Sequence, residues 1–173
     1  TGDSTVPANV RHRFARPIWP PDDLAELRHS SFAWREIATA MRPFDIVHLH
    51  NGAALPHHVL VDVPVVMTVH HDHNPLLARH YQGYGDVAYV AISGRQAGLA
   101  PEIPFKRTIY HGLDVRMYPS GGGRGGYFAF LGRFSKEKAP HLALDAARAV
   151  GASIALGGSP VDDVGRRYYE QEV

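Results

Sequence analysis

The stretch that decides the fold class is YFAFLGRFSKEKAPHLALDAARAVGASIAL, residues 127–156. It begins with the apolar run Tyr127–Leu131, passes through a charged loop, and enters a segment with apolar residues at helical spacing, Pro140–Val150. Gly151 stands where a helix commonly ends on glycine, and the apolar run Ser153–Leu156 follows. A strand, a helix and a second strand in this order predict two parallel strands joined by a crossover helix.

The same alternation extends upstream as far as Pro43. Short and mostly apolar runs predict further strands at 45–50, 64–70, 87–92 and 108–110. Asp22–Arg42 predicts a long helix whose apolar face carries Leu24, Leu27, Trp34, Ile37 and Met41. In the helix Pro140–Val150 the predicted apolar face carries Leu142, Ala146, Ala149 and Val150. We therefore expect an α/β protein with parallel sheets and helices on both faces.

A glycine-rich segment interrupts this alternation. Five of the six residues at 121–126 are glycine, which predicts a flexible linker over 119–126 between a first domain, 1–118, and a second, 127–173. The second domain contains only two predicted strands, and the sequence ends inside a predicted helix at 166–173. Because two strands leave most of a sheet unpaired, we expect the chain to be a fragment of a longer protein.

Composition excludes several function classes. The chain has 45% hydrophobic and 20% charged residues, as expected for a globular protein, and it has no cysteine for a disulfide, a thiolate nucleophile or a zinc–sulfur site. A net charge of +1 gives no general reason to expect a nucleic-acid partner. No apolar run approaches the roughly 20 residues of a transmembrane helix. We expect a cytoplasmic protein.

The loop Gly132–Lys138 carries the sharpest functional signal. Two of the chain's three lysines lie here beside Arg133, directly before the predicted helix. A helix N-terminus has partial positive charge and disfavours cations, so basic residues at this position are explained by a bound anion such as a phosphate. The alternative is a solvated loop in which Glu137 neutralises one of its neighbours.

Histidines form the second unusual feature. Eight of the twelve lie between His48 and His80, and several of them follow the predicted strands 45–50 and 64–70. His48 and His50 share one face of a strand, while His70 is placed at a strand end to orient a substrate or act as a general base. The cluster also resembles metal-ligand arrangements of hydrolases, so a metal-dependent hydrolase is one alternative function.

Five segments together resemble retaining glycosyltransferases of family 4. YFAFLGRFSKEKAPHLALDAA, residues 127–147, resembles the first strand, loop and helix of the donor-binding domain in that family. FDIVHLHN, PVVMTVHHDH, VAYVAIS and RTIYHGLDVRMYP resemble, in the same order, the later part of its acceptor domain. The resemblance implies the GT-B fold, in which two Rossmann-like domains face each other across a cleft, here incomplete. The implied function is transfer of a sugar from a nucleotide-diphosphate sugar to an acceptor with retention of configuration.

Site residues follow from the same resemblance. Arg133 and Lys138, with Gly132, would hold the donor diphosphate, while Gly157 and Gly158 would border the nucleotide. His70 would be the catalytic histidine that approaches the sugar from the acceptor side. No cofactor and no metal are implied. Lys136 has no fixed counterpart in the family and is expected to be solvated.

The chain also departs from the family pattern. His111-Gly112-Leu113-Asp114 stands where the family usually has asparagine, glycine, valine or isoleucine, and aspartate. The glycine-rich loop of the first domain and the glutamate pair that holds the ribose and the sugar would both lie outside this chain. We therefore expect residues 1–173 alone to be inactive. A non-catalytic remnant that self-associates through exposed sheet edges is a further alternative, and the acceptor, the sugar and the base stay open.

Overall fold

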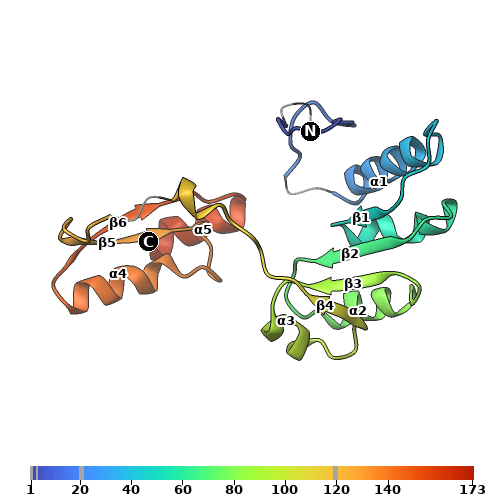
Figure 1. Ribbon diagram of the computed structural model, residues 1–173. Helices are drawn as coiled ribbons and strands as arrows, with labels where there is room; N and C mark the ends of the chain where they lie inside the picture. Colours follow the sequence, from blue (N-terminus) through green and yellow to red (C-terminus); the bar gives the residue numbers. More distant parts are fainter. Residues whose placement is uncertain (1, 3, 20–21, 119–120) are drawn as a thin grey trace. The chain divides into compact units, whose positions relative to one another are not determined.

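The computed structural model describes residues 2, 4–19, 22–118 and 121–173, and the chain divides into two compact units, Thr1–Leu113 and Asp114–Val173 (Figure 1). Each unit has its own sheet. The division falls after Leu113, earlier than the domain end at 118 that the sequence predicts. Residues 119 and 120, the start of the predicted linker, lie outside the described residues.

The first unit is built on a four-stranded parallel sheet. Its strands are β1 (Val47–Leu49), β2 (Val65–Val69), β3 (Ala88–Ala91) and β4 (Phe105–Thr108), and they lie in the order β1-β2-β3-β4. All three pairings are parallel. Parallel neighbours need crossover connections, and these carry the helices of the unit. The parallel α/β architecture predicted from the sequence is confirmed at this level.

The core lies against one face of this sheet. Val47, Met67 and Tyr89 are cross-strand neighbours or near neighbours on that face, and Trp34 of helix α1 (Asp23–Ala38) packs into the same cluster. The opposite face is less covered, since His48 is exposed. Because each strand lies beside the one before it, successive right-handed crossovers step in one direction and fall on one face. β1 is therefore not buried on both faces: Val47 and Leu49 are buried, and His48 between them is exposed.

Short polar residues begin the helices of this unit. After the strands come η1 (Gly52–Leu60, a 3-10 helix), α2 (Pro75–Gln82) and α3 (Gly94–Leu99). The side chains of Asn51, Asn74 and Ser93 accept hydrogen bonds from the first backbone N–H groups of η1, α2 and α3. Each of these capping residues follows a strand end, so helix N-termini gather at the carboxyl-terminal edge of the sheet.

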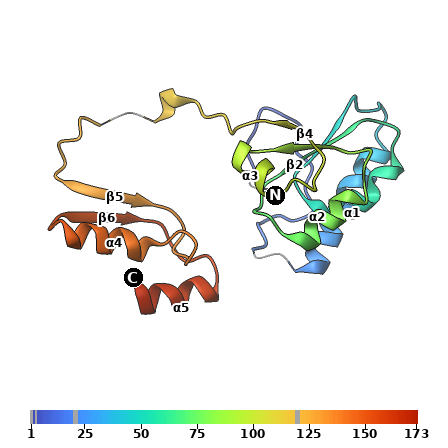
Figure 2. The same ribbon diagram turned by 90° about the horizontal axis from the view of Figure 1, so that it is seen from below.

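The second unit contains two parallel strands and two helices. β5 (Tyr127–Leu131) and β6 (Ser153–Gly157) pair in register, and α4 (Pro140–Ala149) lies against their sheet (Figure 2). α5 (Asp163–Glu172) follows β6, and a short 3-10 helix, η2 (Val115–Met117), precedes the glycine-rich segment. The predicted C-terminal glycine of α4 is confirmed, because Gly151 has a φ of +66° and Ala152 N–H donates to the Ala147 carbonyl oxygen.

Side-chain burial corrects two predictions about helix faces. In α1, Leu24 and Leu27 are exposed, Met41 lies beyond the end of the helix, and the buried residues are Ala25, Ser30 and Trp34. In α4 the predicted apolar face, with Leu142 and Val150, is exposed, whereas Pro140 and Ala147 are buried. The apolar spacing predicts a helix in both segments. In α1 it also predicts the buried Trp34, whereas in α4 the buried Pro140 and Ala147 are not on the predicted face.

The predicted position of one strand is also wrong. The sequence predicts a strand at 108–110, but β4 covers Phe105–Thr108 and carries the exposed side chains of Lys106 and Arg107. As an edge strand with one open side it does not need the apolar composition that strand prediction relies on. The ladder continues one residue further, because Ile109 N–H donates to the Ala91 carbonyl oxygen at 2.8 Å.

Trp34 is expected to be the most important single side chain of the first core. It is 1% exposed, and its Nε1–H donates to the Ala54 carbonyl oxygen at 2.8 Å. Trp34→Ala should lower the free energy of unfolding by about 3–5 kcal/mol, because it leaves a cavity and an unpaired carbonyl. Urea denaturation followed by circular dichroism measures this, with the exposed Trp19→Ala as control. Equal stability of the two variants would show that the core is placed elsewhere.

Candidate functional site

In the second unit, the loops after β5 and β6 run side by side. Gly132 N–H donates to the Gly157 carbonyl oxygen at 3.0 Å, and Phe134 N–H donates to the Ser159 carbonyl oxygen at 3.0 Å. These bonds continue the ladder of β5 and β6 past the strand ends. They hold the segment with Arg133 beside the glycines that the sequence analysis assigned to the nucleotide.

Gly158 is the tightest point of this edge. It has a φ of +148°, and a Cβ atom added there would lie 1.9 Å from the Gly132 carbonyl oxygen. Only glycine fits such a close approach of two backbones. Predicted residues Gly132, Gly157 and Gly158 are therefore brought together, and they leave a stretch of bare backbone at the ends of β5 and β6.

The start of α4 differs from the other helix starts that the structure describes. Ala139 has the left-handed values φ 52° and ψ 49°, no side chain caps the helix, and Pro140 at the first position has no N–H. By contrast, the Asp162 carboxylate accepts from Gly165 N–H at 2.7 Å at the start of α5. A residue other than glycine in the left-handed region is strained, and strain of this kind occurs often at functional sites.

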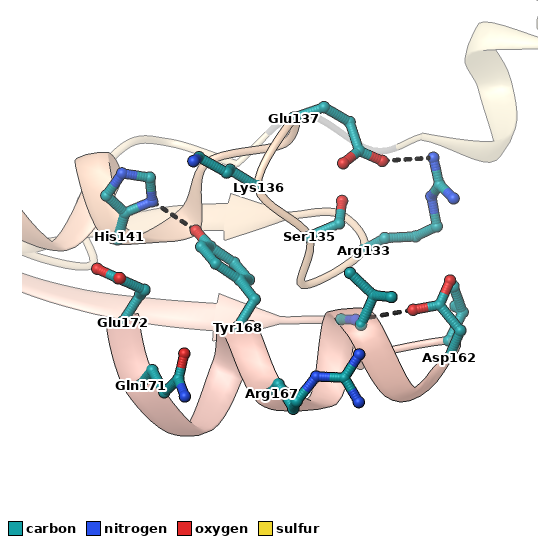
Figure 3. Close-up of a pocket in the computed structure, with 13 residues that line it drawn as sticks. Arg133, Ser135, Lys136, Glu137, His141, Asp162, Arg167, Tyr168, Gln171 and Glu172 are labelled. Atoms are coloured by element: carbon teal, nitrogen blue, oxygen red, sulfur yellow. Dashed lines mark hydrogen bonds and ion pairs between the residues drawn. The ribbon is translucent and has the colours of Figure 1, made fainter.

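A pocket of about 580 Å³ lies between this loop and α5 (Figure 3). Its lining carries three cationic side chains, Arg133, Lys136 and Arg167, and three acidic ones, Glu137, Asp162 and Glu172. Lys138, predicted as the second diphosphate ligand, is exposed and does not line it. Lys136 lines the pocket and is exposed to solvent, as the sequence analysis expected.

Sequence reasoning missed the contribution of α5. His141 Nδ1 and the Tyr168 hydroxyl lie 2.5 Å apart and link the first turn of α4 to α5, with Arg167 next in the chain (Figure 3). Phe134 stacks on Tyr169, with ring centroids 5.2 Å apart. The adjacent pairs Arg166-Arg167 and Tyr168-Tyr169 were the available signal, but only the fold shows that this helix covers the basic loop.

Glu137 partly neutralises the basic loop. Its carboxylate lies 3.2 Å from Arg133 Nη2, and both side chains are largely exposed. The backbone N–H of Glu137, the Ser135 hydroxyl, and the Arg133 and Lys138 cations together hold the pKa of this carboxyl below its usual range. An exposed ion pair of this kind is worth about 0–1 kcal/mol, so a phosphate can displace Glu137 from Arg133 at little cost.

In the first unit, four histidines form a row at the carboxyl-terminal edge of the sheet. His50 Nδ1 and His70 Nε2 are 2.7 Å apart in a hydrogen bond. The ring centroids of His48 and His50 lie 4.3 Å apart, and His111 stacks on His70 with centroids 5.6 Å apart. The prediction that His48 and His50 share a face is confirmed, and His70 lies at the strand end as expected.

Two histidines of this row, His50 and His70, have lowered pKa values. Burial lowers the pKa of His50 below its ordinary value, and the neighbouring His48 and His70 lower it further. Burial likewise lowers the pKa of His70, with added repulsion from His111, His48 and His71. The bond between His50 and His70 agrees with this direction, because one of the two nitrogens must be unprotonated to accept.

Gln96 of α3 fixes the backbone on both sides of His70. Its side-chain amide donates to the carbonyl oxygens of Val69 at 3.0 Å and His71 at 2.8 Å, and its carbonyl oxygen accepts from Ile92 N–H at 2.8 Å. These bonds join the ends of β2 and β3. Gln96 is therefore a positioning residue for His70 that sequence reasoning did not identify.

A second pocket, of about 850 Å³, opens beside this row. His50 and His70 line it together with the apolar side chains of Met67, Leu76 and Leu77. A neutral imidazole can accept a proton from a substrate hydroxyl, or orient that hydroxyl by a hydrogen bond. The pocket lining therefore includes both hydrogen-bonding imidazoles and apolar side chains.

The other histidines of the cluster are engaged elsewhere. His71 Nδ1 donates to the Asp72 carbonyl oxygen, His71 Nε2 lies 2.6 Å from the Tyr81 hydroxyl, and His73 pairs with Glu102. Across residues 2, 4–19, 22–118 and 121–173, no group of three or more His, Cys, Asp or Glu side chains is arranged to hold a metal ion. The metal-dependent hydrolase alternative has no metal centre to support it in this part of the chain.

Comparison with known proteins identifies no relative. No protein-family model matches the chain, and no curated protein matches it. The resemblance to family 4 glycosyltransferases therefore stays a prediction from the sequence.

Among the described helices, none has both the length and the apolar character needed to cross a bilayer.

Gly158→Ala is expected to disrupt the edge formed by β5 and β6. The added methyl group would collide with the Gly132 carbonyl oxygen, and the backbone conformation itself favours only glycine, so we expect a loss of about 1–3 kcal/mol or more. Amide hydrogen exchange in β5 and β6 measures the local loss. Gly121→Ala is the control, because an added Cβ there meets nothing within 4 Å. Unchanged exchange in the Gly158 variant would contradict the close approach.

The histidine row predicts a loss of stability on acidification. Because the pKa values of His50 and His70 are lowered in the folded chain, the unfolded chain binds more protons just below the ordinary value of 6.5. The contribution of this pair to stability is therefore complete above 6.5 and is lost as the pH falls toward the folded pKa values. Urea unfolding between about pH 7 and pH 5 measures this dependence.

His70→Gln should make the stability less dependent on pH than it is in the wild type. His29→Gln, a change at an exposed position of α1, is the matched control and should leave the wild-type dependence intact. If all three proteins lose stability equally between these pH values, the row does not titrate as a coupled group.

Proposed function

We propose that this chain is part of a retaining glycosyltransferase that binds a nucleotide-diphosphate sugar through the second unit. The observation that carries the proposal is the junction of a basic loop, at the carboxyl end of β5, with the uncapped start of α4. The five-segment sequence resemblance assigns the diphosphate to the same loop. Two independent lines, one from charge and backbone and one from sequence, therefore lead to one site.

Stabilisation of the leaving group is the chemistry this loop supports. As the bond between the sugar and the diphosphate breaks, negative charge develops on the diphosphate. Arg133 and Lys136 at the pocket, Lys138 on the loop and the dipole of α4 all favour that charge. Arg167 adds a fourth cation from α5. These groups need no bound metal to perform this role.

Gly157 and Gly158 have no side chains, which supports the proposal that the nucleotide binds beside them. A ligand can approach the main chain closely where no Cβ projects, as in many phosphate-binding turns. His70 is the residue that we propose to contact the sugar. Its pKa is lowered by burial and by the neighbouring histidines, and it is hydrogen-bonded to His50, so its neutral form can accept a hydrogen bond from a hydroxyl or donate one.

Nucleoside diphosphates should bind the chain, and Arg133→Ala and Lys136→Ala should each weaken binding about 10-fold or more, because each removes a charged hydrogen-bond donor. Isothermal titration with uridine, guanosine and adenosine diphosphates measures this. Lys138→Ala separates the two assignments: a loss as large as that of Arg133→Ala supports the resemblance, and a smaller loss supports the pocket. Lys106→Ala, which changes the remaining lysine in β4 of the first unit, should bind like the wild type.

Glu137→Gln is a substitution that we expect to strengthen nucleotide binding. Removing the carboxylate frees Arg133 and takes a negative charge away from the site, so affinity should rise about 3-fold or more, in line with an exposed ion pair of up to about 1 kcal/mol. Salt should reduce binding in every variant that binds. Failure of all three nucleotides to bind, or equal binding by the wild type, Arg133→Ala and Glu137→Gln, would refute the diphosphate site.

A further inference from the structure

The first unit contains a second basic site, formed by the N-terminal segment and α1. An open pocket of about 610 Å³ is lined by Arg13, Arg28 and Arg35, with His12 and the Ser31 hydroxyl between them. Leu27 and Phe32 complete the lining. Among the residues that the structure describes, no Asp or Glu lines this pocket. In a chain of net charge +1, such a concentration of positive charge is local.

The arginine pocket is held in shape by contacts on both of its sides. Gly2 N–H donates to the Phe14 carbonyl oxygen at 3.1 Å and closes the N-terminal segment into a loop. Two guanidinium groups lie over the Phe14 ring, with Arg13 Cζ at 5.8 Å and Arg28 Cζ at 5.7 Å from its centroid. This aromatic ring therefore joins the loop to α1 and holds the two arginines near each other.

The positive charges of these arginines are mostly not balanced by nearby carboxylates. Within the described part of the chain, Arg13 and Arg28 form no ion pair. Glu36 is shared, with Oε1 3.7 Å from Arg35 Nη2 and Oε2 4.0 Å from Arg11 Nε. One carboxylate thus faces two guanidinium groups at the rim, and two more guanidinium groups at the pocket have none.

We propose that the arginine pocket binds a phosphate-ester anion. A carboxylate carries one charge and is satisfied by a single guanidinium fork, whereas a phosphate monoester presents three oxygens and close to two charges. Three arginines together with a serine hydroxyl match the larger anion. Leu27 and Phe32 would cover the organic group of the ester. This site is separate from the proposed diphosphate site and does not depend on it.

The test uses the full chain and a readout specific to this pocket. Glycerol 3-phosphate and inorganic phosphate are titrated while the backbone amide signals of Ser31 and Phe32 are followed by NMR. Vesicles of phosphatidylcholine with and without phosphatidic acid are tested by co-sedimentation. Saturation by glycerol 3-phosphate identifies a soluble ester as the source of the anion. Capture by phosphatidic acid with only weak shifts from the soluble probes identifies a lipid headgroup.

Arg28→Ala should weaken binding about 10-fold or more, and Arg28→Lys should lose less, because lysine keeps the charge but not the two-pronged donor geometry. Arg13→Ala repeats the test from the other side of the pocket. Arg148→Ala, an exposed arginine of α4 paired with Asp145, is the control and should bind like the wild type. Circular dichroism verifies that each variant is folded.

Three results would overturn the proposal. The first is the absence of a saturable amide shift and of vesicle capture with every probe. The second is unchanged affinity in both Arg28→Ala and Arg13→Ala. The third is binding of a single-stranded RNA at this surface while none of the phosphate probes binds.

Discussion

Parallel strand pairing is the constraint on which the rest of this structure depends. A parallel neighbour is reached only through a crossover, so each strand of these two sheets ends at the same edge as its neighbours, and the following helix begins there. In each sheet, the carboxyl ends of the strands and the N-termini of the following helices therefore lie at the same edge as a result of the parallel pairing alone. What differs from edge to edge is the side chains that the loops supply.

The two edges are supplied in contrasting ways. At the end of β2 the loop supplies imidazoles, among them His70, whose pKa is lowered by burial and by its histidine neighbours, and Gln96 holds the backbone around His70. At the end of β5 the loop supplies fixed cations, a backbone free of side chains at Gly158, and a helix start without a cap. One edge thus carries imidazoles and the other carries cations and bare backbone, and our proposal assigns the first to the sugar and the second to the diphosphate.

Much of this organisation can be predicted from the sequence because it rests on local patterns. β5 has the predicted bounds, Tyr127–Leu131, and the glycine after α4 ends the helix as expected. Alternating apolar runs were sufficient to predict parallel sheets, because buried strands need such runs. Strand ends can be located from the same runs, and this is why Arg133 and the glycines after β5 and β6 were expected at one edge, where the structure places them side by side.

The remaining features depend on contacts between segments far apart in the chain. Lys136 lines the pocket because α5 passes beside the loop, and no local pattern encodes that contact. Gln96 donates to the carbonyl oxygen of His71, and Arg28 of α1 contacts Phe14 of the N-terminal segment; each partner is distant in sequence. The face of α4 was mispredicted for the same reason: Pro140 and Ala147 are buried there, whereas Leu142 and Val150 are exposed.

The most direct test of the diphosphate site is an NMR titration of the isotopically labelled chain with a nucleoside diphosphate. The account predicts saturable shifts at the backbone amides of residues 133–142 and at Gly158 and Ser159, with smaller shifts in the first turns of α5. Shifts confined to the first unit, or none at millimolar nucleotide, would contradict it.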